Sequence, residues 1–328
     1  MSNSSSDQPP PPLTYLDLFR QNGGHTAAMW LIISEKCALS LVGILFNAIL
    51  VVATVKAKKL RSICNLLIAM DSAFLGLYQL NALITFLIAL FGINFVTIST
   101  CFYIQVVPMF AVLMSFCVVF QMGLERLANV LFPIWSIKDN SKRFHAAFLL
   151  VSLCSTCYLI WLQHDDSHCV NKMVMCTASD VPALVGLFQT IAFNRAVIMH
   201  ILLIIIYVAI LLILKFKKGN ENFSKSILRS LLFLVVLEMV GWFPILYLNI
   251  VIQTFQLSPV TATYLSAAFT TISSCITASA NAPSLYYFSD LYRDAINAIF
   301  VGVGIKKANK PKSVVVVVTR NGNWINRE

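Results

Sequence analysis

The sequence places an acid and a base side by side at the end of a long apolar run. Glu125 and Arg126 follow the stretch Cys101–Leu124, which contains no Lys, Arg, Asp or Glu. A charged pair in this position indicates a membrane boundary, where Arg can reach water and its cost of insertion falls. Two interpretations follow. The pair is either a charge that stops the segment at the inner surface, or a switch whose Arg is held in one state and released in another.

Three further ionisable residues lie inside apolar segments, at Asp71, Arg195 and Glu238. Such residues are costly in a membrane, so they need partners and mark functional positions. Arg195 lies 20 residues before Lys215, in the outer part of its segment. We expect it either to bind an anionic or carbonyl group of a ligand or to reach the lipid headgroups. We expect Glu238 to be protonated or paired with His200.

Nine Cys residues are present, and three of them are expected on the outer, oxidising side. Cys101 opens the third apolar segment, whereas Cys169 and Cys176 lie between the fourth and the fifth. A bridge from that loop to the third helix would hold a lid over the outer end. We favour Cys101–Cys176, because Cys176 lies closer to the fifth segment, and Cys169 remains the alternative partner. The other six are expected to be small buried hydrophobes. No His or Cys spacing indicates a metal site, so neither a metal nor a cofactor is expected.

The elements that position these residues follow from the composition. Of the 328 residues, 58% are hydrophobic and 12% charged, against about 45–50% and about 25% in soluble domains. The mean hydropathy is +0.79. A spanning helix needs about 20 mainly apolar residues, and seven segments qualify. They are Cys37–Val55, Ile63–Leu90, Cys101–Leu124, Phe144–Gln163, Pro182–Leu214, Ser230–Phe255 and Val260–Phe288. We therefore expect an all-α membrane protein, a seven-transmembrane helix bundle.

The basic residues indicate the orientation. With the N-terminus outside, all but four of the 24 Lys and Arg residues lie on the inner side, as the excess of these residues in cytoplasmic loops requires. We expect an extracellular, disordered tail over residues 1–29, the seven-helix domain over 30–300 and a basic cytoplasmic tail over 301–328. Asn3 begins an outer glycosylation sequon. The net charge of +10 then reflects topology and attraction to anionic lipid, and no nucleic-acid partner is expected.

Two other functional classes fit the sequence less well. A transporter would favour inverted repeats and broken helices at the midplane, and the sequence shows no repeat, so a seven-helix transporter is the weaker alternative. An enzyme would need a catalytic set such as paired carboxylates or a His-Glu-x-x-His motif. Asp71, Glu238 and the histidines show no such spacing. We therefore expect that the protein is not an enzyme.

Several motifs in order resemble the rhodopsin-like G-protein-coupled receptors. A Cys opens the third helix 25 residues before the charged pair, and Glu125-Arg126-Leu127 is similar to the acid-Arg-aromatic signature of that family, with Leu127 in place of the aromatic residue. Further landmarks resemble those of helices one, five, six and seven and of the short amphipathic helix that follows. They are Asn47, Tyr207, Trp242-Phe243-Pro244, Asn281-Ala282-Pro283-Ser284-Leu285-Tyr286, in which Ala282 is inserted between Asn and Pro, and Ser289–Phe300.

Three shorter runs of the sequence resemble the nematode serpentine chemoreceptors of the Srsx class. The runs that carry this resemblance are Leu60–Ala69, Glu125-Arg126-Leu127 with the following Phe132-Pro133, and Asn281–Ser289. The resemblance implies a chemosensory receptor of the plasma membrane, including that of a sensory cilium. Such a receptor binds a small-molecule or peptide cue outside and activates a heterotrimeric G protein inside, with the lipid bilayer as its solvent. A neuropeptide receptor of the same fold is the alternative.

The resemblance also implies roles for individual residues. Pro244 kinks the sixth helix, so Trp242 and Pro244 are expected to form its hinge. The switch and G-protein coupling set is Glu125, Arg126, Tyr207, Asn281, Pro283 and Tyr286, with Glu125 partly neutralising Arg126 and the two tyrosines covering Arg126 once it is freed. The ligand-facing set is Gln105, Pro108, Met109, Val112, Arg195 and Asn249. Pro108 stands where amine receptors carry an Asp, which disfavours a small amine.

A polar network of Asn47, Asp71 and Glu238 is expected inside the bundle. Asn47 and Asn281 should hydrogen-bond across it, because an unpaired amide in lipid is costly. Counting from Asn47 places the sodium-binding Asp of the family at Leu75, four residues after Asp71. Asp71 is therefore expected on the same helix face but one turn nearer the cytoplasm.

Overall fold

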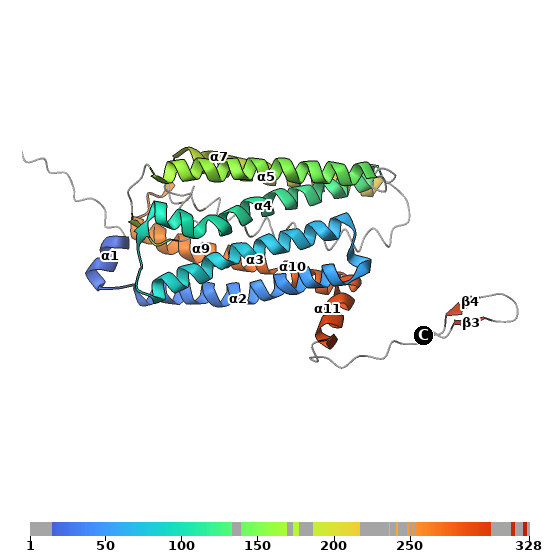
Figure 1. Cartoon of the computed structure of the whole chain (residues 1–328), viewed down its shortest axis with the longest axis horizontal. Coiled ribbons are helices and arrows are strands. Elements are labelled where there is room, and N and C mark those ends of the chain that lie inside the picture. Colours follow the sequence, from blue (N-terminus) through green and yellow to red (C-terminus); the bar gives the residue numbers. More distant parts are fainter. Residues whose placement is uncertain are drawn as a thin grey trace, which may run out of the picture.

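The architecture was derived from a computed structural model, which describes residues 15–132, 139–168, 173–176, 186–216, 236, 241, 248, 251, 254–302, 316–318 and 324–326. The long helices α2, α3, α4, α5, α7 and α9 run side by side (Figure 1). The short helix α1 lies at one end of this bundle, and α11 leaves the other end at a steep angle to the long helices (Figure 1). These ends are called the α1 end and the α11 end below.

The helices cover most of the described chain. Their bounds are α1 Tyr15–Asn22, α2 Ala27–Lys56, the 3-10 helix η1 Lys58–Leu60, α3 Ile63–Leu90, α4 Ile98–Leu131, α5 Asp139–His168, α7 Gly186–Phe216, α9 Pro259–Ser279, α10 Asn281–Phe288 and α11 Asp290–Gly302. Two short antiparallel pairs complete the structure. They are β1 Val96–Thr97 with β2 Met173–Val174, and β3 Val316–Val318 with β4 Trp324–Asn326.

Within the described residues, five helices are long and apolar enough to cross a membrane. They are Ala27–Lys56, Ile63–Leu90, Ile98–Leu131, Lys142–Asp165 and Asn194–Ile213. These helices match the first five segments expected from the sequence, and α9 with α10 matches the seventh. Most of the sixth segment lies outside the described residues. The all-α bundle, with a short helix after the last span, is as predicted.

Local sequence explains where several helices begin. The hydroxyl side chains of Thr26, Ser62, Thr97 and Ser258 each accept a hydrogen bond from the backbone N–H three residues later. This N-cap satisfies one of the donors that a helix start leaves unpaired. Each helix therefore begins directly after a polar hydroxyl residue and continues through the apolar run that follows it.

Close packing fixes how α2 lies against its neighbours. A Cβ atom added at Gly43 would lie 2.1 Å from Gln79 Nε2 and 2.2 Å from Ser279 Oγ. These two side chains, from α3 and α9, hydrogen-bond to each other at 3.0 Å. Glycine at position 43 thus lets three helices meet around one polar contact, as small residues do in membrane bundles.

The N-terminal helix is a departure from the sequence-based expectation. The expected disordered tail is wrong for Tyr15–Asn22, which forms α1. Tyr15 is 5% exposed, and its ring meets that of Tyr264 edge-on with 5.6 Å between centroids. Phe19 packs against Phe95 in the same way at 5.0 Å. The aromatic contacts bury more apolar area than a loose tail could, and so they stabilise the helix.

His25 lies inside this aromatic cluster and makes it sensitive to pH. The hydroxyl of Tyr15 lies 3.1 Å from His25 Nδ1. Burial lowers the pKa of His25 below its usual value of 6.5, and a hydrogen bond with the Asn94 side chain opposes part of this shift. Burial raises the pKa of Tyr15 to about 12, so this phenol stays neutral near physiological pH. The protonation of His25 therefore decides the charge of the cluster between pH 5 and 8.

We predict that acidification releases α1. Below pH 6.5 the released state binds more protons than the docked state, because the docked His25 has the lower pKa, and docking weakens as pH falls. Hydrogen exchange of residues 15–22, corrected for the intrinsic effect of pH, should be slow at pH 7.5 and faster at pH 5.5. In His25→Gln the difference should disappear. Equal protection of the unsubstituted protein at both pH values would contradict this prediction.

The cysteines also differ in part from expectation. Cys37, Cys64 and Cys117 are buried, as expected, whereas Cys154 and Cys157 are exposed on α5. Both lie within the candidate span Lys142–Asp165, so these thiols face outward from the bundle rather than into its core. A membrane helix can expose small apolar residues to lipid without the cost that water would impose.

Candidate functional site

A cavity of about 550 Å³ lies at the α11 end, between η1, α3, α4, α10 and α11. Three cationic side chains line it, from Lys59, Arg61 and Arg126. The lining also contains the N-cap Ser62, whose hydroxyl accepts from the Asn65 N–H at 3.3 Å, and the carboxylate of Glu125. The cavity therefore carries more positive than negative groups and suits an anionic or strongly hydrogen-bonding partner.

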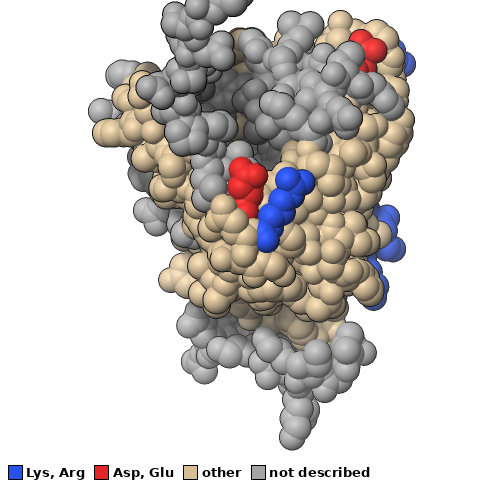
Figure 2. All heavy atoms as spheres, turned by 90° about the vertical axis from the view of Figure 1, so that its left-hand side faces the viewer, with Lys and Arg blue, Asp and Glu red and all other residues tan. Residues whose placement is uncertain are grey.

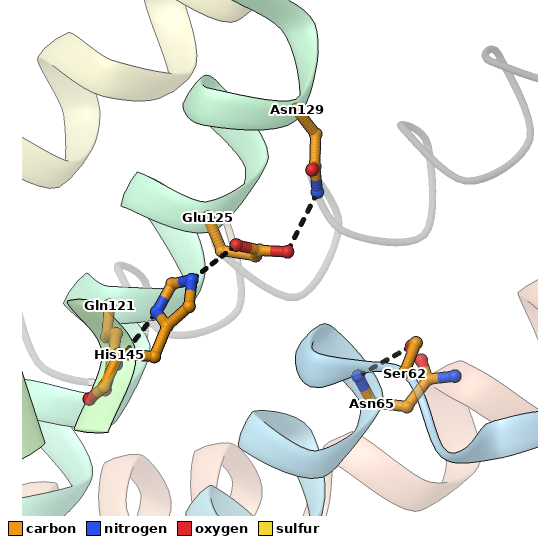
Figure 3. A network of polar contacts seen from close by, with 6 residues as sticks. All are labelled: Ser62, Asn65, Gln121, Glu125, Asn129 and His145. Carbon is orange, nitrogen blue, oxygen red and sulfur yellow. Dashed lines mark hydrogen bonds and ion pairs between the residues drawn. The ribbon is translucent and has the colours of Figure 1, made fainter. Parts of the chain in front are cut away.

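Glu125 contacts α5 rather than Arg126. Its Oε2 lies 2.6 Å from His145 Nε2, and Asn129 Nδ2 donates to its Oε1 at 3.1 Å. On the far side of the imidazole, Gln121 Nε2 donates to the His145 carbonyl at 3.0 Å. Figure 3 shows these side chains in a row from α4 to α5. Among the described residues Glu125 and Arg126 form no ion pair, and the expected partial neutralisation of Arg126 by Glu125 stays a prediction.

The groups that interact directly with Arg126 are a thiol and phenols. It is close enough to the Cys64 thiol and the Tyr207 phenol to interact with them electrostatically, and its Nε is buried without a hydrogen-bond partner. Tyr292 of α11 lies near the same guanidinium, and burial raises the pKa of this phenol, which keeps it neutral. Arg126 thus faces the cavity as a cation whose charge no described acid pairs with.

A polar cluster joins several helices deeper in the bundle. Ser115 Oγ donates to Asp71 Oδ1 at 2.5 Å, and Asn281 Nδ2 donates to Asp71 Oδ2 at 2.9 Å. Asn47 Nδ2 donates to the Ala278 carbonyl at 2.7 Å. Asn47 and Asn281 therefore both hydrogen-bond across the bundle, as expected. These bonds tie α2, α3 and α4 to the junction of α9 and α10.

Asp71 joins the inner polar network, as expected from the sequence. It lies four residues before Leu75, the position to which the count from Asn47 assigned the sodium-binding Asp of the family. Asp71 nevertheless contacts Asn281 directly, whereas Leu75 is a fully buried apolar residue. The connection between α2 and α3 is the short 3-10 turn η1, with one residue before it and two residues after it.

Tyr286 contacts α11 in this structure, and its expected role as a cover for a freed Arg126 stays a prediction. Its hydroxyl donates to Asn297 Oδ1 of α11 at 3.2 Å. The inserted Ala282 accounts for this direction. Five residues separate Asn281 from Tyr286, and at about 100° per residue they lie roughly 140° apart around the helix, against about 40° for a four-residue spacing. Asn281 therefore faces Asp71 while Tyr286 faces α11. Tyr207, in contrast, lies near Arg126.

The expected ligand-facing residues of α4 lie close to the loop that carries β2. Cys101 and Cys176 form a disulfide, the pairing favoured from the sequence. Gln105 Nε2 donates to the Cys176 carbonyl at 3.0 Å. Met109 is buried and Val112 partly buried in the apolar cluster that includes Cys176, and Pro108 is a buried residue inside α4. The loop is thus fixed to α4 by one covalent bond and one hydrogen bond.

The α1 end of the bundle differs in character from the α11 end. Figure 2 views the α1 end, where few Lys, Arg, Asp or Glu side chains lie among the residues that the structure describes. The apolar clusters around Tyr78 and around Tyr15 lie in the helices that reach this end. A site at this end would therefore favour apolar or weakly polar ligands.

Arg195 does not join the ligand-facing residues. Its Nη2 donates to Cys117 Sγ of α4 at 2.7 Å, and the side chain lines a second cavity, of about 470 Å³, beside Phe120 and Ile198. None of Gln105, Pro108, Met109 or Val112 lines that cavity. The spacing of Arg195 from Lys215 predicted how far along α7 the residue lies. The direction of its side chain around the helix axis decides which neighbour it contacts.

Some expected site residues lie outside the described residues, so their predicted roles stay predictions. They are Asn3, Cys169, Glu238, Trp242, Pro244 and Asn249. His200 is described, and its Nδ1 lies 2.7 Å from the Ala196 carbonyl of the same helix. Its ring packs edge-on against Phe116, with 5.3 Å between centroids.

Several contact residues escaped the sequence reasoning, among them Ser115 and His145. Ser115 lies 11 residues before Arg126, about three helical turns, and so on the same face of α4. That spacing was a usable signal for its part in the network. The sequence signal for His145 was weaker, because this residue is a single His at the start of an apolar segment. Its partner, Glu125, lies on another helix, and one helix alone does not reveal such a pair.

The comparison with known proteins agrees with this geometry. Residues 40–300 match the family described as serpentine type 7TM GPCR chemoreceptor Srsx. No curated protein matches the chain. The match extends from α2 to α11 and so includes both cavities and the Asp71 cluster. It shows a multi-pass membrane protein of a receptor class rather than an enzyme class. The chain therefore belongs to the Srsx family of serpentine seven-transmembrane chemoreceptors.

Proposed function

We propose that this protein is a chemosensory receptor that couples to a heterotrimeric G protein at the α11 end. The observation that supports this most directly is the cationic cavity around Arg126. His145 and Asn129 hold Glu125, so Arg126 has no acid partner among the described residues. An inserted peptide segment from a G protein would supply acceptors for its free donors.

The ligand is proposed to bind at the α1 end. The disulfide-fixed loop supports a small-molecule or peptide cue there, and the few charged side chains among the described residues of this end (Figure 2) favour a lipophilic one. In this arrangement the N-terminus is extracellular, Asn3 is available for glycosylation, and residues 301–328 form a cytoplasmic tail. The Trp242–Pro244 hinge would carry the signal between the two ends.

Cell-based screening tests this proposal. Cells that express the receptor would be exposed to odorant and peptide panels and read by calcium and cAMP. For any active cue, Arg126→Ala should lower the response at least about tenfold, the loss expected when one charge-assisted hydrogen bond is removed. Surface expression should not change. Arg143→Ala, at an exposed Arg of α5, is the matched control and should respond normally.

Two results would contradict the proposal. A full response from Arg126→Ala would show that the cavity does not serve coupling. An N-terminal epitope tag that stays inaccessible to antibody on intact cells would reverse the orientation and exclude a cue from outside. If no cue in the panels is active, ligand-independent nucleotide exchange on purified G proteins gives the same comparison of Arg126→Ala with Arg143→Ala.

A further inference from the structure

An arginine with no acid partner lies in the side of the bundle. Arg195 Nη2 donates to Cys117 Sγ at 2.7 Å, and its Nη1 is buried with no hydrogen-bond partner. Within the described residues no acid forms an ion pair with it. A thiol sulfur is a weak acceptor. The guanidinium therefore retains most of its hydrogen-bonding capacity and all of its charge.

The charged end of the Arg195 side chain lies beside the middle of α4, although Arg195 itself is the second residue of the apolar span Asn194–Ile213 of α7. Cys117 lies 19 residues after Ile98, where α4 begins, and 14 residues before Leu131, where it ends. At 1.5 Å per residue these separations are about 28 and about 21 Å. An arginine beside Cys117 is therefore far from both headgroup layers, in a region where an ionised group without a partner is most costly. A partner from the membrane itself would remove that cost.

The space beside Arg195 is an apolar cleft open to lipid. It has a volume of about 470 Å³, and besides Asn194 and Arg195 its lining is apolar. The lining residue Ile198 is 56% exposed and Leu202 is 41% exposed. They lie four residues apart and thus on one face of α7. Since this helix crosses the membrane, its exposed face meets acyl chains, and Phe120 of α4 forms the opposite wall.

We propose that this cleft binds an amphiphilic anion from the bilayer. Its head group, a carboxylate or phosphate, would accept hydrogen bonds from Arg195, and its acyl chain would lie along the apolar wall. The planar guanidinium fork matches both kinds of head group. Charge complementarity selects this occupant, because the described lining offers one cation, one amide and no acid beside apolar side chains. The binding does not depend on G-protein coupling, so its failure would leave the proposed function untouched.

Photo-crosslinking in a defined membrane tests the inference. The full-length receptor, in nanodiscs of phosphatidylcholine, would be labelled with a diazirine-bearing palmitate, and the labelled peptides identified by mass spectrometry. Label is expected on peptides that carry Phe120 or Ile198. An excess of oleate should compete with the probe, whereas oleyl alcohol, which lacks the charge, should not. Arg195→Gln should lower the labelling about tenfold or more, as the loss of a charge-assisted hydrogen bond implies.

A pair of tryptophan variants gives a control that keeps the arginine. Ile198→Trp should fill the cleft and abolish labelling there. Ile201→Trp changes a residue of the same type on the same helix, 49% exposed but outside the lining, and should label normally. The tryptophan variants and the competition by oleyl alcohol test the proposed binding of an anion even if Arg195→Gln fails to fold.

Lipid composition identifies the source of the anion. If phosphatidylglycerol in the nanodiscs suppresses palmitate labelling, the occupant is an anionic phospholipid. If it does not, the occupant is a free fatty acid. Either result supports the inference. Equal competition by oleate and oleyl alcohol, or normal labelling of Ile198→Trp, would overturn it.

Discussion

Substitution of either disulfide cysteine should destabilise the receptor strongly. The Cys101–Cys176 bond closes a loop with a sequence separation of 75, and removing a cross-link of that length costs about 4 kcal/mol in the chain-entropy estimate. The loss should be larger than that of the covalent bond alone, because the Cys176 carbonyl accepts from Gln105 Nε2 and from Thr85 Oγ1. Cys101→Ser and Cys176→Ser should each abolish most surface expression and lower the thermal unfolding midpoint of the purified receptor.

The free cysteines supply the controls for this experiment. Cys154 is exposed on α5 and forms no disulfide, so Cys154→Ser should change the free energy of unfolding by no more than about 0.5 kcal/mol. The double variant of Cys101 and Cys176 should be no worse than either single variant, because both remove the same bond. If Cys169→Ser had the large effect and Cys176→Ser had none, the assigned pairing would be refuted.

Replacement of Asp71 should have the second large effect. Asp71 is 2% exposed, and its two carboxyl oxygens accept from Ser115 and Asn281. Asp71→Ala leaves two buried polar groups without their acceptor, and each costs about 1–3 kcal/mol. We therefore expect a loss of about 3 kcal/mol in the free energy of unfolding, measured by thermal denaturation in detergent. Asp71→Asn retains one carbonyl acceptor and should lose about half as much.

An exposed acid at the α11 end is the matched control for Asp71. Asp290 pairs with Arg293 one turn later on α11, and its side chain is 82% exposed. Exposed ion pairs contribute about 0–1 kcal/mol, so Asp290→Ala should leave the unfolding midpoint nearly unchanged. A loss from Asp71→Ala as small as that from Asp290→Ala would show that the Ser115 and Asn281 contacts do not stabilise the bundle.

Features that depend on one segment were predictable from the sequence. The number of apolar residues in a row determined the helices, since a span needs about 20 of them. Thr26, Ser62 and Thr97 marked the helix starts through their hydroxyl side chains. The disulfide followed from the few cysteines expected in one compartment. The need to pair amides in lipid predicted that Asn47 and Asn281 hydrogen-bond across the bundle.

Features that depend on two segments were predicted less well. Glu125 precedes Arg126 in the chain but pairs with His145 on α5, and only the rotation of α4 against α5 decides that. The direction of Arg195 depends on its rotation around α7, which a residue count does not give. Helix α1 has apolar residues Tyr15, Leu18 and Phe19 at helical spacing, but its Ser- and Pro-rich surroundings masked this short pattern.

The contact between Tyr286 and Asn297 has a mechanical consequence. It joins the end of the last span to a helix that leaves the bundle at a steep angle (Figure 1), so a tilt of α10 must drag α11 through the interface between water and acyl chains. If the proposed cue acts by tilting α10, bilayer thickness and curvature would act on the same pair of helices. The resting activity of the receptor would then depend partly on the surrounding lipid.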